Sequence, residues 1–205
     1  MTRAAKLAAA LAAALCLTGT TACLRTKAVR YYTLAGEGGA WPVRRGTVRY
    51  TVRIAAVSVP EMVDRPELVL RVSTTELAID ENHQWAEPLR AAIARTIADG
   101  LTRDLDGALV STTDEAERRR GPSDVQLSID VRHLDLGLSA GAAIDVSWTA
   151  RWAENGPIRT GRSVRSVPAV PPGGYDAAVA ACAAALEAVS KEIARSVRSD
   201  YLSRQ

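Results

Sequence analysis

The sequence contains no phenylalanine, and among its 205 residues there are only two histidines and three cysteines. Three cysteines are too few for the disulfide framework of a small secreted scaffold. No Cys, His and carboxylate cluster has the spacing of zinc or iron ligands, so we expect no metal site and no cofactor. The formal net charge is only +3, whereas a nucleic-acid-binding domain carries a larger basic excess on one face. A hydrophobic content of 47% with 24% charged residues is ordinary for a globular protein, which excludes a disordered or polytopic membrane chain.

Motifs of catalysis are also missing. The sequence has no G-x-S-x-G nucleophile motif and no glycine-rich phosphate-binding loop. Asp80, Glu81 and Glu87 lie close to His83 in the sequence, and acid–base catalysis uses such groups. However, they surround an expected connection between a strand and a helix, where acidic residues commonly form turns and caps. We therefore predict no catalytic residue and a protein that is not an enzyme.

The N-terminus has the pattern of an export signal. Arg3 and Lys6 precede an uncharged apolar run at residues 7–17, which as a helix spans about 16 Å and is too short to cross a bilayer. Small residues at 18–22 then lead to Cys23, an ending that resembles a bacterial lipobox. We predict that residues 1–22 are a cleaved signal peptide and that Cys23 carries a covalent lipid.

Two alternatives to this assignment are an ordinary cleaved signal that leaves a free thiol, and lipidation at Cys16, which bulky Leu15 disfavours. A cysteine with several acyl chains stays bound to a membrane, whereas one chain anchors only reversibly. Leu24 follows Cys23, and an aspartate there often retains lipoproteins in the inner membrane of Gram-negative bacteria. We therefore expect an outer-membrane location, with the protein facing the periplasm.

The mature chain divides into a lipidated cysteine with a tether and an initial strand (residues 23–47), followed by one domain (residues 48–205). Period-two alternation of apolar residues predicts strands, and apolar residues recurring every three or four positions predict helices. A phase slip in the strand pattern near His133 indicates a β-bulge. The expected strands are 31–34, 48–59, 67–73, 76–80, 125–138, 144–152 and 158–167, and the expected helices are 85–106, with Pro88 in its first turn, and 175–201.

This order of elements favours an α+β fold. We expect a two-layer sandwich in which two amphipathic helices pack on one face of a mostly antiparallel sheet. Cys182 shares an apolar helix face with Leu186, which predicts a small buried thiol. Trp148 and Trp152 share one strand face, where they either belong to the core or line an apolar ligand pocket.

Three segments of the chain resemble a known family. They are YYTL at 31–34 soon after the lipobox cysteine, VSVPEMVDRPELV at 57–69 and NHQWAEPL at 82–89. Together they resemble the ABC-type transport auxiliary lipoproteins, the family of paraquat-inducible protein C. The resemblance follows the whole mature chain in order and length, and the DRPELV and W-x-E-P-L motifs are its most specific parts.

The resemblance implies a non-catalytic lipoprotein that works with an inner-membrane ABC permease and ATPase and with an MCE-domain protein. Such systems move lipids or other hydrophobic molecules between the inner and outer membranes. We expect Asp64, Arg65, Pro66 and Trp85 to form a docking surface for the MCE partner, although turn and core roles also suit these residues. A homo-oligomer is compatible with the resemblance, and no nucleic-acid partner is expected. The alternative function is a periplasmic carrier that binds lipid in its own apolar pocket.

Overall fold

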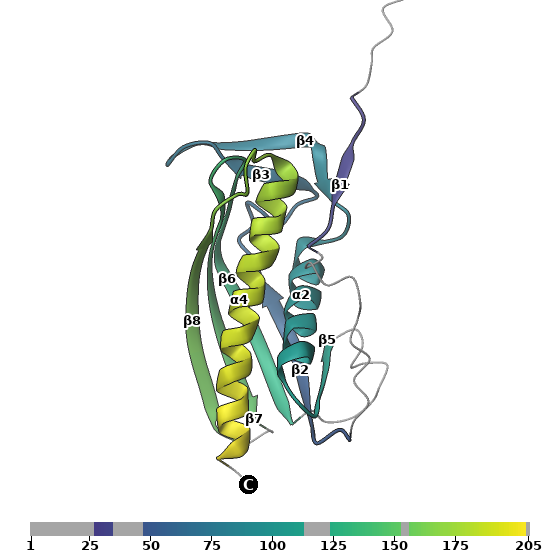
Figure 1. Ribbon diagram of the computed structural model, residues 1–205, viewed down its shortest axis with the longest axis vertical. Coiled ribbons are helices and arrows are strands. Elements are labelled where there is room, and N and C mark those ends of the chain that lie inside the picture. The colour runs from purple at the N-terminus through teal and green to yellow at the C-terminus, as the bar shows by residue number, and fades with distance from the viewer. Residues whose placement is uncertain (1–26, 35–46, 113–123, 153–155, 204–205) are drawn as a thin grey trace, which may run out of the picture.

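A computed structural model describes residues 27–34, 47–112, 124–152 and 156–203 of the chain (Figure 1). The signal peptide, Cys23 and most of the tether therefore lie outside the described residues. The elements in chain order are β1 (Arg30–Tyr32), β2 (Tyr50–Ser58), β3 (Glu67–Arg71), β4 (Leu77–Trp85), α2 (Leu89–Asp104), β5 (Ala108–Thr112), β6 (Val125–Gly137), β7 (Gly141–Trp152), β8 (Ile158–Val167) and α4 (Tyr175–Leu202).

Strand β6 is the centre of the sheet. Strand β7 pairs antiparallel with its whole length, from Val125↔Trp152 to Gly137↔Gly141, and β8 continues antiparallel beyond β7. On the other edge of β6, strand β2 pairs parallel and carries β5 as a parallel edge strand. This larger group of strands forms the long body behind the helices in Figure 1.

A smaller group of strands joins the carboxyl end of β6. Strand β3 pairs parallel with β6 at Leu70↔Leu136, and β4 pairs antiparallel with β3. Strand β1 then adds to β4 in parallel, with Tyr32 opposite Trp85. In Figure 1 this group crosses one end of the body, where the N-terminal chain also approaches. Strand β1 is thus joined to the body through β4 and β3.

Both helices cover the same face of the larger group (Figure 1). Helix α4 packs on β6, β7 and β8, helix α2 packs on β2 and β5, and the two helices contact each other. The inward residues of β6 and β7 are apolar and buried, whereas Ser128, Asp130 and Arg132 on the other face of β6 are exposed. Burial of one apolar sheet face against two amphipathic helices is the main source of stability for this arrangement.

Two glycines are required by close packing in this core. A Cβ atom at Gly100 would lie 2.0 Å from Oγ of Ser190, so the missing side chain lets α2 approach α4. A Cβ atom at Gly161 on β8 would lie 2.2 Å from the ring of Trp148, its cross-strand neighbour on β7. The absence of a side chain at Gly100 permits the close contact between the two helices, and its absence at Gly161 leaves room for the indole ring of Trp148.

The α+β class is confirmed, but the expectation of a mostly antiparallel sheet is wrong. Among the described residues, four strand pairings are parallel and three are antiparallel. The sequence interpretation missed β5, whose Ala108–Thr112 segment follows α2 directly. Parallel neighbours require a long crossover connection. The chain passes from β2 to β5 through β3, β4 and α2, which is such a crossover and permits their parallel pairing.

Several boundaries also differ from the prediction. Trp85 ends β4 instead of beginning a helix, and Pro88 is the residue immediately before α2. Ala56 is exposed because the β2–β6 register shifts between Ile54 and Ala56, which turns the strand over. The bulge near His133 is confirmed by a register shift between Val131 and His133.

Candidate functional site

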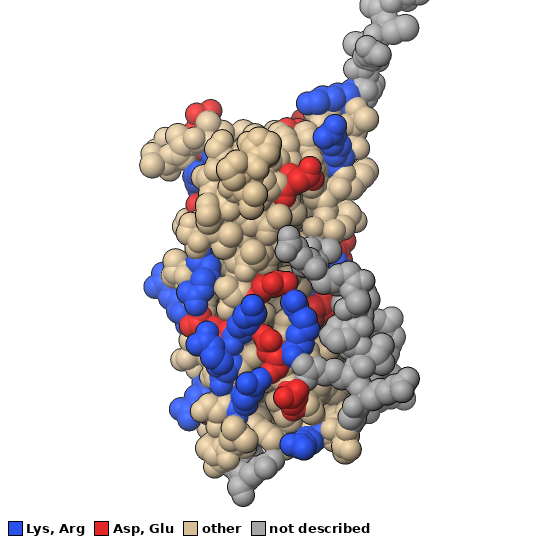
Figure 2. Space-filling model, viewed as in Figure 1, with Lys and Arg blue, Asp and Glu red and all other residues tan. Residues whose placement is uncertain are grey.

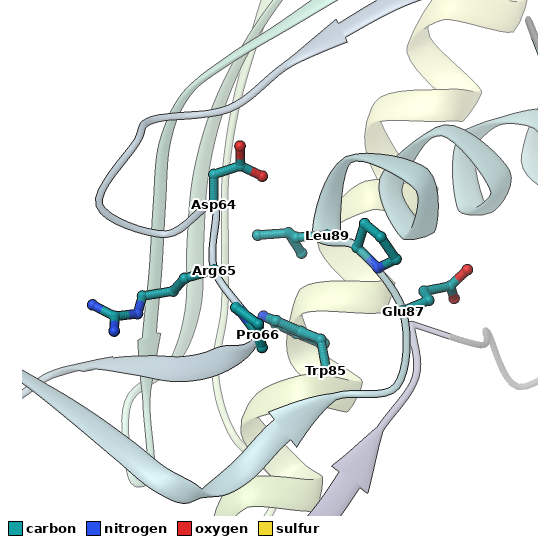
Figure 3. A pocket seen from close by; sticks show the side chains of 7 residues that line it. Asp64, Arg65, Pro66, Trp85, Glu87 and Leu89 are labelled. Carbon is teal, nitrogen blue, oxygen red and sulfur yellow. The ribbon is translucent and has the colours of Figure 1, made fainter.

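A pocket of about 310 Å³ lies where the smaller strand group meets the start of α2 (Figure 3). All four residues predicted to form a docking surface line it, so the structure brings the two family-like motifs together. The other lining residues are the Glu, Pro and Leu of the W-x-E-P-L motif, so the motif already pointed to them in the sequence. The pocket is lined by Asp64, Arg65, Pro66, Trp85, Glu87, Pro88 and Leu89.

Backbone hydrogen bonds hold the two motifs against each other. The connection 60–66 leaves β2 in a turn in which the backbone N–H of Asp64 donates to the carbonyl of Pro60 at 3.2 Å. The backbone N–H of Trp85 then donates to the carbonyl of Pro66 at 2.7 Å, which ties the end of β4 to this turn. Two segments about twenty residues apart in the chain are thus fixed as the walls of one pocket.

The apolar part of the pocket is made by Trp85, two prolines and Leu89. Trp85 and Leu89 are buried and belong to the core, so their positions are set by packing. Pro88 has no N–H and occupies the N-cap position of α2, where an N–H would have no partner within the helix. The pocket is therefore attached to rigid elements on both sides.

The charged side chains of the rim are paired with one another. Asp64 forms an ion pair with Arg90 at 2.5 Å, and Nε of Arg65 donates a hydrogen bond to the Glu67 carboxylate at 2.8 Å. That bond from Arg65 lowers the pKa of Glu67 below its ordinary value. The rim is therefore close to neutral, although its charges stay accessible to a partner.

Glu87 forms a further ion pair on the rim. Its two carboxylate oxygens accept hydrogen bonds from the two terminal guanidinium nitrogens of Arg95, which lies further along α2. This bidentate contact is the largest cause of the raised pKa of Arg95. An apolar floor with a neutral, hydrogen-bonding rim is suited to holding an apolar side chain of another molecule.

A second polar cluster lies between β4 and the start of α4. The rings of His83 and Tyr175 are stacked with their centroids 3.6 Å apart, and Tyr32 lies against both rings. Asp80 accepts the Tyr175 hydroxyl and the backbone N–H of Asn82, and Nδ1 of His83 lies 3.1 Å from its carboxylate.

These bonds decide the protonation of the cluster. The Tyr175 hydroxyl is the main cause that holds the pKa of Asp80 well below its ordinary value, with His83 contributing less. Burial first, and then the bond to Asp80, raise the pKa of Tyr175 to about 12. An ionised Asp80 and a protonated Tyr175 thus join β4 to α4. Tyr175 is 95 residues from Asp80 in the chain, so nothing in the local sequence marks it as the partner.

Three other predicted residues have clear positions. Trp148 and Trp152 are buried in the main core, and neither lines the pocket at Trp85. Cys182 is fully buried, and burial raises the pKa of its thiol to about 12, which confirms the expected inert thiol. Cys23 lies outside the described residues, so its lipidation stays a prediction.

Among the described residues, no group of three or more His, Cys, Asp or Glu side chains is arranged to hold a metal ion. None of the described helices combines the length and hydrophobicity needed to cross a bilayer.

The family model of the ABC-type transport auxiliary lipoprotein component matches residues 32–194. The chain belongs to this family. Membership makes it an auxiliary component of a transport system and a lipoprotein of the cell envelope. The matched segment includes both walls of the pocket at Trp85, together with α2, most of α4 and the whole sheet except most of β1. A comparison with curated proteins gave no match.

Solved structures share the fold. A crystal structure of an uncharacterised protein aligns with a TM-score of 0.66 at 22% identity, covering 83% of this chain and 99% of that one. Protein XCC0632 from Xanthomonas campestris aligns with a TM-score of 0.57 at 20% identity, covering 80% of this chain and 92% of that one. At this level of identity the likeness establishes the fold alone.

Proposed function

We propose that this protein is a non-catalytic docking subunit of a transport system that moves lipids or other hydrophobic molecules between the two membranes of a Gram-negative cell. A lipid on Cys23 holds it at the outer membrane, facing the periplasm. The pocket at Trp85 receives an MCE-domain protein, which connects the subunit to the inner-membrane permease and ATPase. The family supports the transport role, and the observation that carries the docking proposal is the convergence of both motifs on one pocket.

The form of the pocket supports docking over catalysis. Its buried tryptophan and prolines offer an apolar surface that a partner side chain can cover, and such anchors supply most of the affinity of a protein interface. Its paired charges at Asp64, Arg65 and Glu87 form the polar rim that gives an interface its orientation. Asp64 and Glu87 are each paired with an arginine of α2, so the rim presents bonded charge pairs to a partner.

Charge reversal at Arg65 tests the docking surface. The Arg65–Glu67 pair is partly exposed, and exposed ion pairs contribute little to folding, so we expect Arg65→Glu to leave the fold intact. It places two acidic side chains at the rim, and we expect the affinity for the MCE-domain partner to fall about ten-fold or more.

The matched control is Arg162→Glu. Arg162 also pairs with a carboxylate, Asp145, but it lies on the outer strand β8, away from the pocket. Binding is measured with the purified partner by surface plasmon resonance, and folding by circular dichroism. Equal affinity of the Arg65 variant and the wild-type protein would reject the docking site, and a loss with the control variant alone would move it to β8.

Replacement of Cys23 by alanine tests the anchor. Without the acyl chains the protein lacks the proposed outer-membrane anchor, so we expect the variant to be absent from the outer-membrane fraction. Mass spectrometry of the wild-type N-terminal peptide should show the acylated cysteine. If the variant stays in the outer membrane, the anchor is not Cys23. Lipid that co-purifies in stoichiometric amount would instead favour a carrier with its own pocket.

A further inference from the structure

One end of the body gathers three turns that are far apart in the chain. Strand β6 ends and β7 begins at this end, and the backbone N–H of Gly174, just before α4, donates to the carbonyl of Leu138 at 2.8 Å. Strand β3 reaches the same end because Leu70 pairs with Leu136. We call this region the β1 end, since β1 is joined to it through β4 (Figure 1). Its turns are residues 72–75, 137–141 and 168–174.

The β1 end differs from the opposite end in charge. None of its three turns contains a charged residue, and the last of them reads PAVPPGG. At the opposite end, the backbone N–H of Arg49 donates to the carbonyl of Gly107, and Asp200 near the end of α4 pairs with Arg159. In Figure 2 the charged side chains are densest over the lower half of this face, whereas the upper part carries fewer of them. Asp176 lies in the first turn of α4, and Arg30 on β1 and Glu76 are exposed.

Large apolar side chains are exposed at the β1 end. Val170 is 74% exposed, Tyr31 65%, Val72 58% and Ile79 49%. They come from three separate elements, namely the turn before α4, strand β1 and the β3–β4 hairpin. Apolar groups that converge from distant segments onto turns without charged residues mark an interaction site.

The chain that leads to Cys23 decides what this surface faces. Cys23 precedes Arg30, the first residue of β1, by seven residues. Fully extended, they span at most about 25 Å. Helix α4 alone, with 28 residues, is about 42 Å long and runs from the β1 end to the opposite end. A membrane that holds Cys23 is thus within reach of the β1 end and out of reach of the opposite end.

We propose that the β1 end rests on the lipid bilayer, with Val72, Ile79, Val170 and Tyr31 in the interfacial region. This inference rests on the proposed acylation of Cys23. The turns carry no charge that would have to be dehydrated, and interfacial segments of this kind enter about 5–10 Å into the headgroup region. Glu76, which follows the first turn and is exposed, keeps the contact shallow. The contact fixes the orientation of the whole body relative to the membrane.

Site-specific fluorescence tests the contact. The only free cysteine of the described residues is buried and Cys23 is acylated, so a new surface cysteine can be labelled selectively. Val170→Cys and Thr74→Cys place an environment-sensitive nitrobenzoxadiazole dye at the β1 end, and Ser199→Cys places it near the exposed end of α4 as the control. The lipidated proteins are reconstituted into vesicles of phosphatidylethanolamine and phosphatidylglycerol, with and without a spin-labelled lipid that quenches the dye.

The expected result is a blue shift and quenching by the spin-labelled lipid at positions 74 and 170, with neither change at position 199. Flotation of the vesicles and mass spectrometry of Cys23 are measured on the same samples. If the protein lacks the acyl group or does not float, the proposed anchor fails, and this inference fails with it. If it floats but the dyes at 74 and 170 are not quenched, the anchor stands and the bilayer contact is refuted. A blue shift that appears without lipid, as protein concentration rises, would assign the surface to contacts between copies and also refute it.

Discussion

Replacing Tyr175 by phenylalanine removes one hydroxyl and keeps the ring stacked on His83. The lost bond is the one that the hydroxyl donates to ionised Asp80. A hydrogen bond to a charged group contributes about 1.5–3 kcal/mol to folding. Because the Asp80 side chain is 21% exposed and keeps the backbone N–H of Asn82, we expect the low end of that range, about 1.5 kcal/mol.

Urea unfolding followed by tryptophan fluorescence measures this loss. With a denaturant dependence of about 2 kcal/mol per molar urea, the midpoint should fall by about 0.7 M at pH 7. The matched control is Tyr31→Phe at the same end of the molecule, since Tyr31 is exposed and its change should stay within about 0.5 kcal/mol.

The pH dependence gives a second readout of the same bond. The pKa of Asp80 is lowered in the folded state, so its contribution is present above the ordinary value of 3.8 and is lost as the pH falls below it. The pKa of Tyr175 is raised from 10 to about 12, so its contribution is present below pH 10 and is lost as the pH rises toward 12. The difference in unfolding free energy between wild type and variant should therefore be constant between about pH 5 and 9. It should shrink at lower and at higher pH. A variant as stable as wild type at pH 7, or a difference that persists unchanged in acid, would refute this reasoning.

Other positions give shorter tests. Gly161→Ala forces a Cβ atom into the ring of Trp148, and overpacking of this kind costs about 1–3 kcal/mol, to be measured by urea unfolding; an unchanged midpoint would mean that the indole moves freely. Gly100→Ala meets Ser190 across the helix contact, and the combined change with Ser190→Gly should recover part of the lost stability in a double-mutant cycle; strict additivity of the two changes would contradict the contact. The thiol of Cys182 should react with a maleimide in urea but not in native buffer, as judged by mass spectrometry, because it is fully buried and its pKa is raised; rapid native labelling would mean that α4 opens.

Local patterns in the sequence predict the elements that one face of the sheet buries. Strands β6 and β7 and helix α4 each bury one face in the core. The period of their apolar residues therefore matches the element that forms, two for the strands and three to four for the helix. The slip near His133 was visible because the apolar set moves by one residue across it, which only a bulge permits.

Pairing direction could not be predicted in the same way. Strand β5 is a short edge strand whose residues are all half-buried, so it has no alternation to detect. Without β5, the parallel path through α2 stays hidden, and successive strands suggest antiparallel hairpins. The motifs named four of the residues that line the pocket, as a docking surface, but the pocket itself was not predicted. The hydrogen bond from Trp85 to Pro66 that brings the motifs together is a tertiary contact without a local sequence signal.

The parallel pairing of β1 with β4 has a mechanical consequence. If the β1 end rests on the membrane as proposed, the chain enters β1 from the membrane side and β1 runs away from that side, parallel to β4. A pull on an acylated Cys23 would therefore act along the strand and shear all the β1–β4 hydrogen bonds together, whereas a pull across it would break them one at a time. The same tension would pass through β4 and β3, which form the neighbourhood of the pocket, to the junction at Leu70 and Leu136. A subunit stretched between its membrane and a bound partner would thus carry the strain through a short chain of strands and leave the helix-covered core unloaded.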